Sequence, residues 1–268
     1  QKRSLGSGVL INADGFILTN EHVIAKAAKI HVVLSDKQEF DASVIGADTK
    51  SDLAIIKIES DTPLPFVEMG RSDDLMIGEQ VLAIGNPFGL QQTVTTGIIS
   101  ALNRNLRAGK NKVYSDFIQV DASINPGNSG GPLLNINGSL IGINTAIYQK
   151  AEGIGFAIPI DHAKRIVLEL VNYGKVRRGW LGVSVQELDA QLLRHFKLDR
   201  QRGVLVVGVA EKSSAGKAGL KRGDIIIGID DHKVGNKSDF RGRMASYTVG
   251  SSIRFSLLRD GKKMGLRV

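Results

Sequence analysis

Residues 124–143, INPGNSGGPLLNINGSLIGI, place one serine, Ser129, among glycines and prolines and then continue into two apolar runs. Asn137-Gly138 lies between those runs and is a strong signal for a two-residue β-hairpin turn, because both residues tolerate positive φ. We therefore expect a strand and a hairpin after the serine, in a domain built mainly of antiparallel strands.

Two nucleophile signatures fit the sequence GNSGG. The G-x-S-x-G elbow of α/β-hydrolases requires a helix directly after the serine, with Asp and His later in the chain. Here Gly-Gly-Pro follows Ser129, and glycine and proline are the poorest helix formers. The pattern instead favours the chymotrypsin-type arrangement, in which the catalytic residues come in the order His, Asp, Ser.

His22 and Asp52 are the upstream candidates. His22 directly follows a predicted strand, whereas His31 alternates within a strand pattern and is most simply a strand residue. Asp52 opens the apolar run DLAIIKI, where a part-buried carboxylate needs a partner; its alternative role is to cap its own turn. A single histidine is more often structural than catalytic, but the order His22, Asp52, Ser129 predicts a catalytic triad.

The glycines around the serine suit acyl transfer. Backbone N–H groups must point at the developing oxyanion, so the loop before the serine has to turn tightly. We expect Gly127 and Ser129 to supply those amides. Gly130 and Gly131 then let the chain return to a strand without side-chain clashes.

The composition is that of a globular protein. The 268 residues are 42% hydrophobic and 23% charged, which suits one large or two moderate domains. The absence of cysteine excludes disulfides, thiolate catalysis and cysteine metal sites. The net charge is +8, but the basic residues are dispersed and lack the interleaved aromatic residues of a nucleic-acid groove. We expect no nucleic-acid partner, metal or cofactor, and no apolar run approaches the roughly 20 residues that span a bilayer.

Hydrophobic periodicity divides the chain. A single amphipathic helix is predicted over residues 161–174, with Asp161 as its N-cap, Gly174 at its end and an apolar stripe that includes Leu170 and Val171. Before it, strands are predicted at 8–12, 15–20, 29–34, 52–58, 79–85, 93–102, 116–121, 131–136 and 140–148. After it, residues 179–268 alternate strands (WLGVSVQ, GVLVVGV, DIIIGID, SIRFSLLRD, KMGLRV) with short helices (DAQLLRHF, SSAGKAGL, KSDFRGRMA).

Motifs along the whole chain resemble the HtrA/Deg serine proteases, in which a trypsin-like domain precedes PDZ domains. The matching stretches are GSGVLINADGFILTNEHVI, SDLAIIKI, GEQVLAIGNPFGL, TTGIISALNR, FIQVDASINPGNSGGPLLN, GINTAI, GIGFAIPI, GWLGV and AGLKRGDIIIGID. The resemblance implies a mainly β fold, with a chymotrypsin-like double β-barrel protease domain over residues 1–175. A PDZ domain of the small α/β-roll type is implied over residues 176–268. The family's first barrel has a further strand before residue 6, for which this sequence offers no candidate.

The resemblance also carries over site residues. His22, Asp52 and Ser129 match the triad, and the amides of Gly127 and Ser129 match the oxyanion hole. Further matches are a substrate pocket for small or medium aliphatic side chains at Ile124, Asn144, Thr145 and Ile147; a regulatory arginine at Arg104; and a PDZ carboxylate loop at Trp180, Leu181, Gly182 and Val183. In a PDZ domain an extended peptide adds to a sheet edge while loop amides bind its terminal carboxylate. Trp180 alone is equally explained as a buried residue at a domain edge.

The function implied by the resemblance is ATP-independent endoproteolysis of unfolded or misfolded proteins in protein quality control. Peptide binding by the PDZ domain would regulate it through loops near residues 86–128 and 142–153. The relatives imply a periplasmic or envelope location and a trimer or trimer-based oligomer. The rival hypothesis is a PDZ-linked chaperone, scaffold or stress sensor whose triad is held in a resting state.

Overall fold

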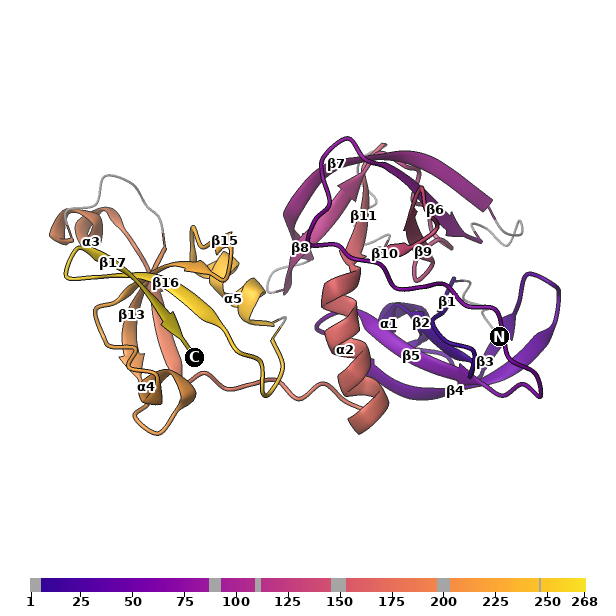
Figure 1. Cartoon of the computed structure of the whole chain (residues 1–268), viewed down its shortest axis with the longest axis horizontal. Helices are drawn as coiled ribbons and strands as arrows, with labels where there is room; N and C mark the ends of the chain where they lie inside the picture. The colour runs from indigo at the N-terminus through magenta and orange to yellow at the C-terminus, as the bar shows by residue number, and fades with distance from the viewer. Residues whose placement is uncertain (1–5, 87–92, 109–111, 146–152, 197–202, 246) are drawn as a thin grey trace. The chain divides into compact units, whose positions relative to one another are not determined.

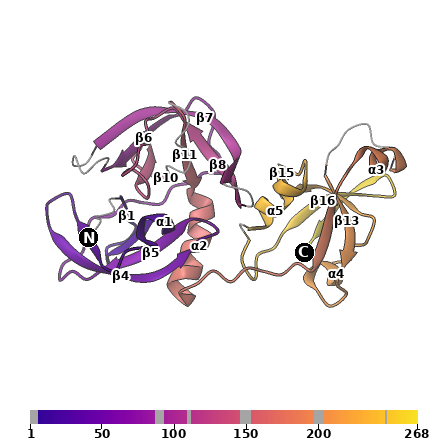
Figure 2. The same cartoon turned by 180° about the vertical axis from the view of Figure 1, so that it is seen from behind.

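The computed structural model describes residues 6–86, 93–108, 112–145, 153–196, 203–245 and 247–268. The chain divides into two compact units, residues 1–176 and 177–268, which we call the first and the second unit. Figure 1 shows both units, and Figure 2 shows them from behind. The architecture is mainly β, as predicted, with each unit built around its own apolar core.

The first unit begins with a five-stranded antiparallel sheet in the order β1-β2-β5-β4-β3. Its strands are β1 (Val9–Leu10), β2 (Phe16–Thr19), β3 (Ile30–Val33), β4 (Glu39–Asp48) and β5 (Leu53–Ile58). The apolar strand β5 lies in the middle and is buried along almost its whole length. β4 was not predicted, although its exposed Glu39, Asp41 and Ser43 alternate with the partly buried Phe40 and Ala42, because Glu, Asp, Ala and Gly have low β-propensity.

The second sheet of this unit closes into a barrel in the order β10-β11-β8-β7-β6-β9. Its strands are β6 (Gln80–Gly85), β7 (Thr93–Ala108), β8 (Lys112–Val120), β9 (Pro132–Asn135), β10 (Leu140–Thr145) and β11 (Gly155–Pro159). Strands β9 and β10 form the predicted hairpin, and Gly138 in its turn has φ 80°. A strand, and not a helix, therefore follows Ser129, which contradicts the α/β-hydrolase elbow.

Helix α2 (Ile160–Tyr173) packs against strands of both sheets, including β5 and β10 (Figure 1). It ends as predicted at Gly174, which has φ 68°. Two details of the prediction were wrong. The N-cap is Pro159 and not Asp161, because the helix begins at Ile160, two residues earlier than a helix capped by Asp161 would. Val171 is 41% exposed, because only one narrow stripe of the helix faces the sheets.

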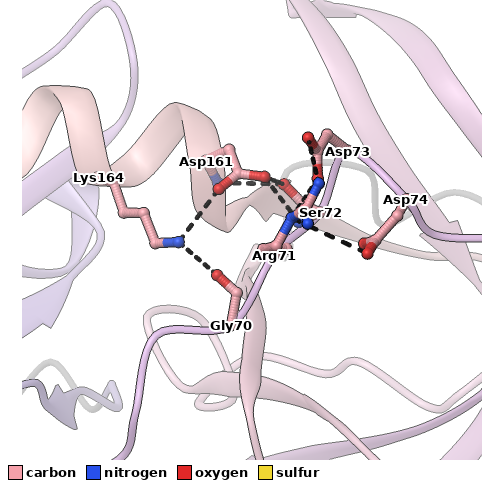
Figure 3. Close-up of polar contacts among 7 residues, drawn as sticks. All are labelled: Gly70, Arg71, Ser72, Asp73, Asp74, Asp161 and Lys164. Carbon is pink, nitrogen blue, oxygen red and sulfur yellow. Dashed lines mark hydrogen bonds and ion pairs between the residues drawn. The ribbon is translucent and has the colours of Figure 1, made fainter.

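Hydrogen bonds connect the linker between β5 and β6 to the start of α2 (Figure 3). The Asp161 carboxylate accepts hydrogen bonds from the amide (2.7 Å) and hydroxyl (3.1 Å) of Ser72. Lys164 donates to the Gly70 carbonyl and pairs with Asp161 at 3.2 Å. Burial by itself would raise the pKa of Asp161, but the hydrogen bonds from Ser72 and Lys164 together outweigh it and lower the pKa below its usual value. Asp161 thus acts as an anchor for the linker instead of a helix cap.

The second unit has a sheet in the order β12-β13-β14-β16-β17, with the short β15 paired to β14. Its elements are β12 (Val183–Glu187), α3 (Ala190–His195), β13 (Val204–Val209), α4 (Ser214–Lys217), β14 (Ile225–Ile229), β15 (His232–Lys233), α5 (Lys237–Ala245), β16 (Arg254–Arg259) and β17 (Lys262–Arg267). All except β15 were predicted. Within the described residues of both units, no helix is long and apolar enough to cross a membrane.

Candidate active site

Asp52 lies directly before β5 and has φ 57°, a left-handed conformation that is uncommon outside glycine. This backbone turn lets its carbonyl and its carboxylate both face the segment that carries His22. The carbonyl accepts from the amide of Glu21 (3.2 Å) and the side chain of Asn20 (2.9 Å). The Asp52 side chain is 2% exposed, so its charge depends on hydrogen bonds to the carboxylate for stabilisation.

His22 is held by this aspartate in two ways. It lies in the one-turn helix α1 (Glu21–Ile24), and its backbone amide donates to Asp52 Oδ1 at 3.1 Å. Its ring Nδ1 lies 2.9 Å from Oδ1 and 2.8 Å from Oδ2 of the same carboxylate. Because an ionised carboxylate only accepts hydrogen bonds, Nδ1 carries the hydrogen and Nε2 is left as the basic nitrogen. The alternative that Asp52 merely caps its own turn does not account for these bonds.

Ser129 lies in a tight turn that we call the nucleophile loop, residues 125–131. The amide of Asn128 donates to the carbonyl of Asn125 at 2.9 Å, and Gly127 has φ 106°. Gly130 has φ 84°, and a Cβ there would lie 2.2 Å from the Ser7 carbonyl oxygen and 2.3 Å from Thr19 Oγ1. Glycine is therefore required at 130 both by its conformation and by lack of space.

Strand β10 connects the nucleophile loop with the aspartate. The amide of Gly130 donates to the carbonyl of Asn144 at 2.9 Å, and the next residue, Thr145, places its hydroxyl 3.5 Å from Asp52 Oδ2. The space beside Gly130 is also closed by the Asn20 backbone, two residues before His22. The three predicted triad residues, far apart in sequence, thus belong to one continuous network of contacts.

The predicted pocket residues have different surroundings. The Asn144 side chain is fully buried and donates to the carbonyls of Pro132 (2.9 Å) and Ile84 (3.3 Å), so it holds strands together. Ile124 packs against Gly155, where a Cβ would meet its side chain at 2.8 Å. Ile147 lies outside the described residues. The assignment of these residues to a substrate pocket stays a prediction.

Two further predicted features belong to other elements of the chain. Arg104, in β7, donates from Nε to Gln119 on the neighbouring strand β8 at 2.9 Å. In the second unit Trp180 is 73% exposed, which contradicts the alternative of a buried tryptophan. Gly182, two residues later, has φ 74° and would place a Cβ 2.2 Å from that of Ser213. The loop between Trp180 and Val183 is therefore tight and leads directly into the edge strand β12.

Sequence reasoning missed Ser7 and the side-chain contact of Thr145. Ser7 donates from its amide to the Ser129 carbonyl (2.9 Å) and from its hydroxyl to the Gly127 carbonyl (2.6 Å). The only signal available was its place in GSG near the start of a matching motif. Among the residues that the structure describes, no group of three or more His, Asp or Glu side chains could hold a metal ion.

Comparisons with known proteins identify the domains of the chain. Residues 6–143 match the model of the trypsin-like peptidase domain, and residues 179–268 match that of the PDZ domain. The chain is 46% identical over 269 residues to the periplasmic serine endoprotease DegP of Escherichia coli (strain K12), covering 99% of this chain and 56% of that protein. It is also 46% identical over 266 residues to a probable periplasmic serine endoprotease, DegP-like, of Chlamydia trachomatis, covering 98% and 53%. The chain thus spans a little over half the length of these relatives.

A solved structure described as the HtrA-type protease AlgW with tripeptide superposes with a TM-score of 0.76 at 44% identity. That match covers 99% of this chain and 88% of the other. A second structure, of the same protease with decapeptide, has a TM-score of 0.73 at 45% identity and covers 98% and 81%. Together with the triad network and the two-unit fold, these matches show that the chain belongs to the HtrA-type family of trypsin-like serine proteases with a PDZ domain.

Proposed function

We propose that this chain is a serine endopeptidase. Ser129 Oγ attacks the scissile carbonyl carbon while His22 Nε2 takes its proton, and Asp52 keeps the imidazole in the required tautomer and stabilises the imidazolium. His22 then gives the proton to the leaving amine, and water hydrolyses the acyl-enzyme by the same route. The observation that carries the proposal is that the Asp52 carboxylate hydrogen-bonds both the ring nitrogen Nδ1 and the backbone amide of His22.

The backbone amides of Gly127 and Ser129 are assigned as the hydrogen-bond donors of the oxyanion hole. The positive φ of Gly127 and the bond from Asn128 to Asn125 support a tight turn in which both amides point to one side. The pocket at Ile124, Asn144, Thr145 and Ile147 would accept small or medium aliphatic side chains, and Arg104 would belong to the regulatory loops. These finer assignments remain proposals.

The second unit is proposed to bind C-terminal or extended peptide segments. Strand β12 lies at the edge of its sheet, and helix α5 contacts the same strand. Glu187, at the end of β12, accepts from the amide of Lys237 at the start of α5 (2.9 Å), which fixes the helix beside the strand. A peptide strand added to β12 would place its terminal carboxylate at the loop formed by Trp180, Leu181 and Gly182.

We propose residues 1–175 as the protease domain and 176–268 as the PDZ domain, acting in the periplasm as a trimer or trimer-based oligomer on unfolded polypeptides. Regulation would pass from the bound peptide to the loops near residues 86–128 and 142–153. The names of the relatives support the protease activity and the location, and the two compact units support the division of the chain.

The test is casein degradation by the whole chain, measured with and without a panel of C-terminal peptides. The wild type is expected to cleave casein faster with an activating peptide, and Ser129→Ala and His22→Ala are expected to lose cleavage. His31→Ala is the matched histidine control, because His31 pairs with Glu39 on an exposed strand and should leave cleavage unchanged. Casein cleavage that survives in Ser129→Ala overturns the proposal. Suppression of casein aggregation without cleavage by the wild type favours the chaperone hypothesis.

A further inference from the structure

We propose that Ser7 is a positioning residue for catalysis, whose hydroxyl holds the nucleophile loop in the shape that an oxyanion requires. The inference rests on the proposed peptidase function. It concerns a residue at the start of the described chain, more than a hundred positions from Ser129.

All the polar groups of Ser7 are used at this site. Its hydroxyl donates to the carbonyl of Gly127 at 2.6 Å and accepts from the amide of Asn86 at 3.0 Å. Its amide donates to the carbonyl of Ser129 at 2.9 Å, and its own carbonyl accepts from Thr19 Oγ1 at 2.6 Å. Ser7 therefore joins three distant segments: the end of β6, the strand β2 that leads to His22, and the nucleophile loop.

The hydroxyl acts at the point where the loop has least conformational restraint. Gly127 has φ 106°, a region open almost only to glycine, so the peptide planes on either side of it can rotate with few steric barriers. One of those planes contributes the Gly127 amide proposed for the oxyanion hole. The bond from Ser7 Oγ fixes the carbonyl of Gly127 in the other plane, and the bond from Asn128 to Asn125 fixes the amide of that same plane. Ser7 and Asn125 thus hold opposite ends of one peptide group.

The bond with Asn86 makes the hydroxyl part of a closed triangle. The Asn86 amide lies 3.0 Å from Ser7 Oγ and 3.4 Å from the Gly127 carbonyl, so removal of the hydroxyl leaves this amide with only the longer contact. The Gly127 carbonyl would then be free to turn toward Asn86. A turn of this carbonyl changes the loop without unfolding the barrel, since the other bonds of Ser7 come from its backbone.

The test is Ser7→Ala in the whole chain, compared with the wild type on a fluorogenic peptide. Removal of an oxyanion-hole donor itself slows acylation by about 100- to 1000-fold, and a residue that acts through the loop should have a smaller effect. We expect kcat to fall about tenfold, with KM changed less than about twofold. The affinity for a peptide boronate, whose tetrahedral adduct occupies the oxyanion hole, is expected to fall by about the same factor as kcat.

Ser72→Ala is the matched control. The Ser72 hydroxyl lies in the linker between the sheets and also donates one bond and accepts one, both with Asp161 in α2. It should lower the unfolding temperature by a similar amount and leave kcat and boronate affinity unchanged. Ser7→Thr keeps a hydroxyl and is expected to retain kcat within about threefold.

Three results would overturn the inference: an unchanged kcat in Ser7→Ala, a loss in kcat equal to that of Ser72→Ala, or a Ser7→Thr variant as slow as Ser7→Ala. These failures are distinct from failure of the peptidase proposal. If the peptidase proposal fails, the wild type itself neither cleaves the peptide nor binds the boronate. If only the inference about Ser7 fails, the wild type is active and Ser7→Ala does not show the expected loss.

Discussion

Replacement of Asp52 tests how this one residue both positions His22 and sets its tautomer. In Asp52→Asn the side-chain oxygen can still accept from the His22 amide, now 3.1 Å from Asp52 Oδ1. The new NH₂ group faces ring Nδ1, which lies 2.8 Å from Oδ2. NH₂ only donates, so this contact favours the tautomer in which Nδ1 accepts and Nε2 carries the hydrogen, over the tautomer in which Nδ1 donates to the remaining oxygen at 2.9 Å. His22 would then be unable to take the proton of Ser129.

The expected loss in kcat for Asp52→Asn is about 10⁴-fold, the effect of this exchange in the chymotrypsin-type triad, which corresponds to about 5.5 kcal/mol of barrier. Its free energy of unfolding should change by less than about 1 kcal/mol, because the backbone bond to His22 is kept. In Asp52→Ala both bonds are lost and the part-buried amide of His22 is left without this partner, so a destabilisation of about 1–3 kcal/mol is expected in addition to the loss of activity.

The assay combines kcat on a fluorogenic peptide with urea unfolding of the same three proteins. The reasoning predicts that activity separates wild type from both variants, whereas stability separates Asp52→Ala from the other two. An Asp52→Asn variant that retains more than a tenth of the wild-type kcat would refute the tautomer argument. Equal destabilisation by Asn and Ala would refute the claim that the carboxylate also supports the His22 backbone.

Three other substitutions, one of them with a matched control, test contacts within the two units. Gly130→Ala should destabilise the chain by about 2–4 kcal/mol and abolish labelling by a fluorophosphonate, because its Cβ would lie 2.2 Å from a carbonyl oxygen. Gly138→Ala is the control, since Gly138 has a similar φ but no atom within 4 Å of the added Cβ. This control should lower the free energy of unfolding by only about 1 kcal/mol, measured by thermal unfolding. Asp161→Asn should lower stability at neutral pH by about 1 kcal/mol. The pKa of Asp161 is lowered in the folded state, so the stability difference between wild type and Asp161→Asn should have its full size above the ordinary pKa, near 3.8. It should disappear as the pH falls through the lower pKa of the folded state. A constant stability difference from pH 7 to pH 2 would contradict the assignment. Arg259→Met should destabilise the second unit by about 3–5 kcal/mol, since it removes the two hydrogen bonds of 2.7 Å that the buried Asp224 carboxylate accepts from Arg259. Unfolding followed by circular dichroism measures this loss. A much smaller loss would show that the ion pair is dispensable.

The features that could be predicted from sequence are those with a local pattern. The Asn137-Gly138 turn fixes a hairpin after the serine, and the apolar run that begins at Asp52 forms the central strand β5. The order of His22, Asp52 and Ser129 needed no structure either, because it depends on residue types and on their sequence along the chain.

Features that depend on contacts between distant segments could not be predicted. Strand β4 was not predicted because several of its residues (Glu, Asp, Ala and Gly) have low β-propensity, and its pairing with β5 becomes visible only in the sheet. Asp161 has the sequence context of a helix cap, yet its carboxylate is taken by Ser72, 89 positions away. The role of Ser7 likewise depends on a hydrogen bond across 120 positions, for which a single sequence holds no periodic signal.

The most direct test of the central claim is to locate the adduct of a fluorophosphonate by mass spectrometry of the digested protein. We expect one adduct, on Ser129, whose formation is lost in Ser129→Ala and strongly slowed in His22→Ala, while His31→Ala labels like the wild type. An adduct on another serine, or labelling of the wild type that His22→Ala leaves at full rate, would contradict it.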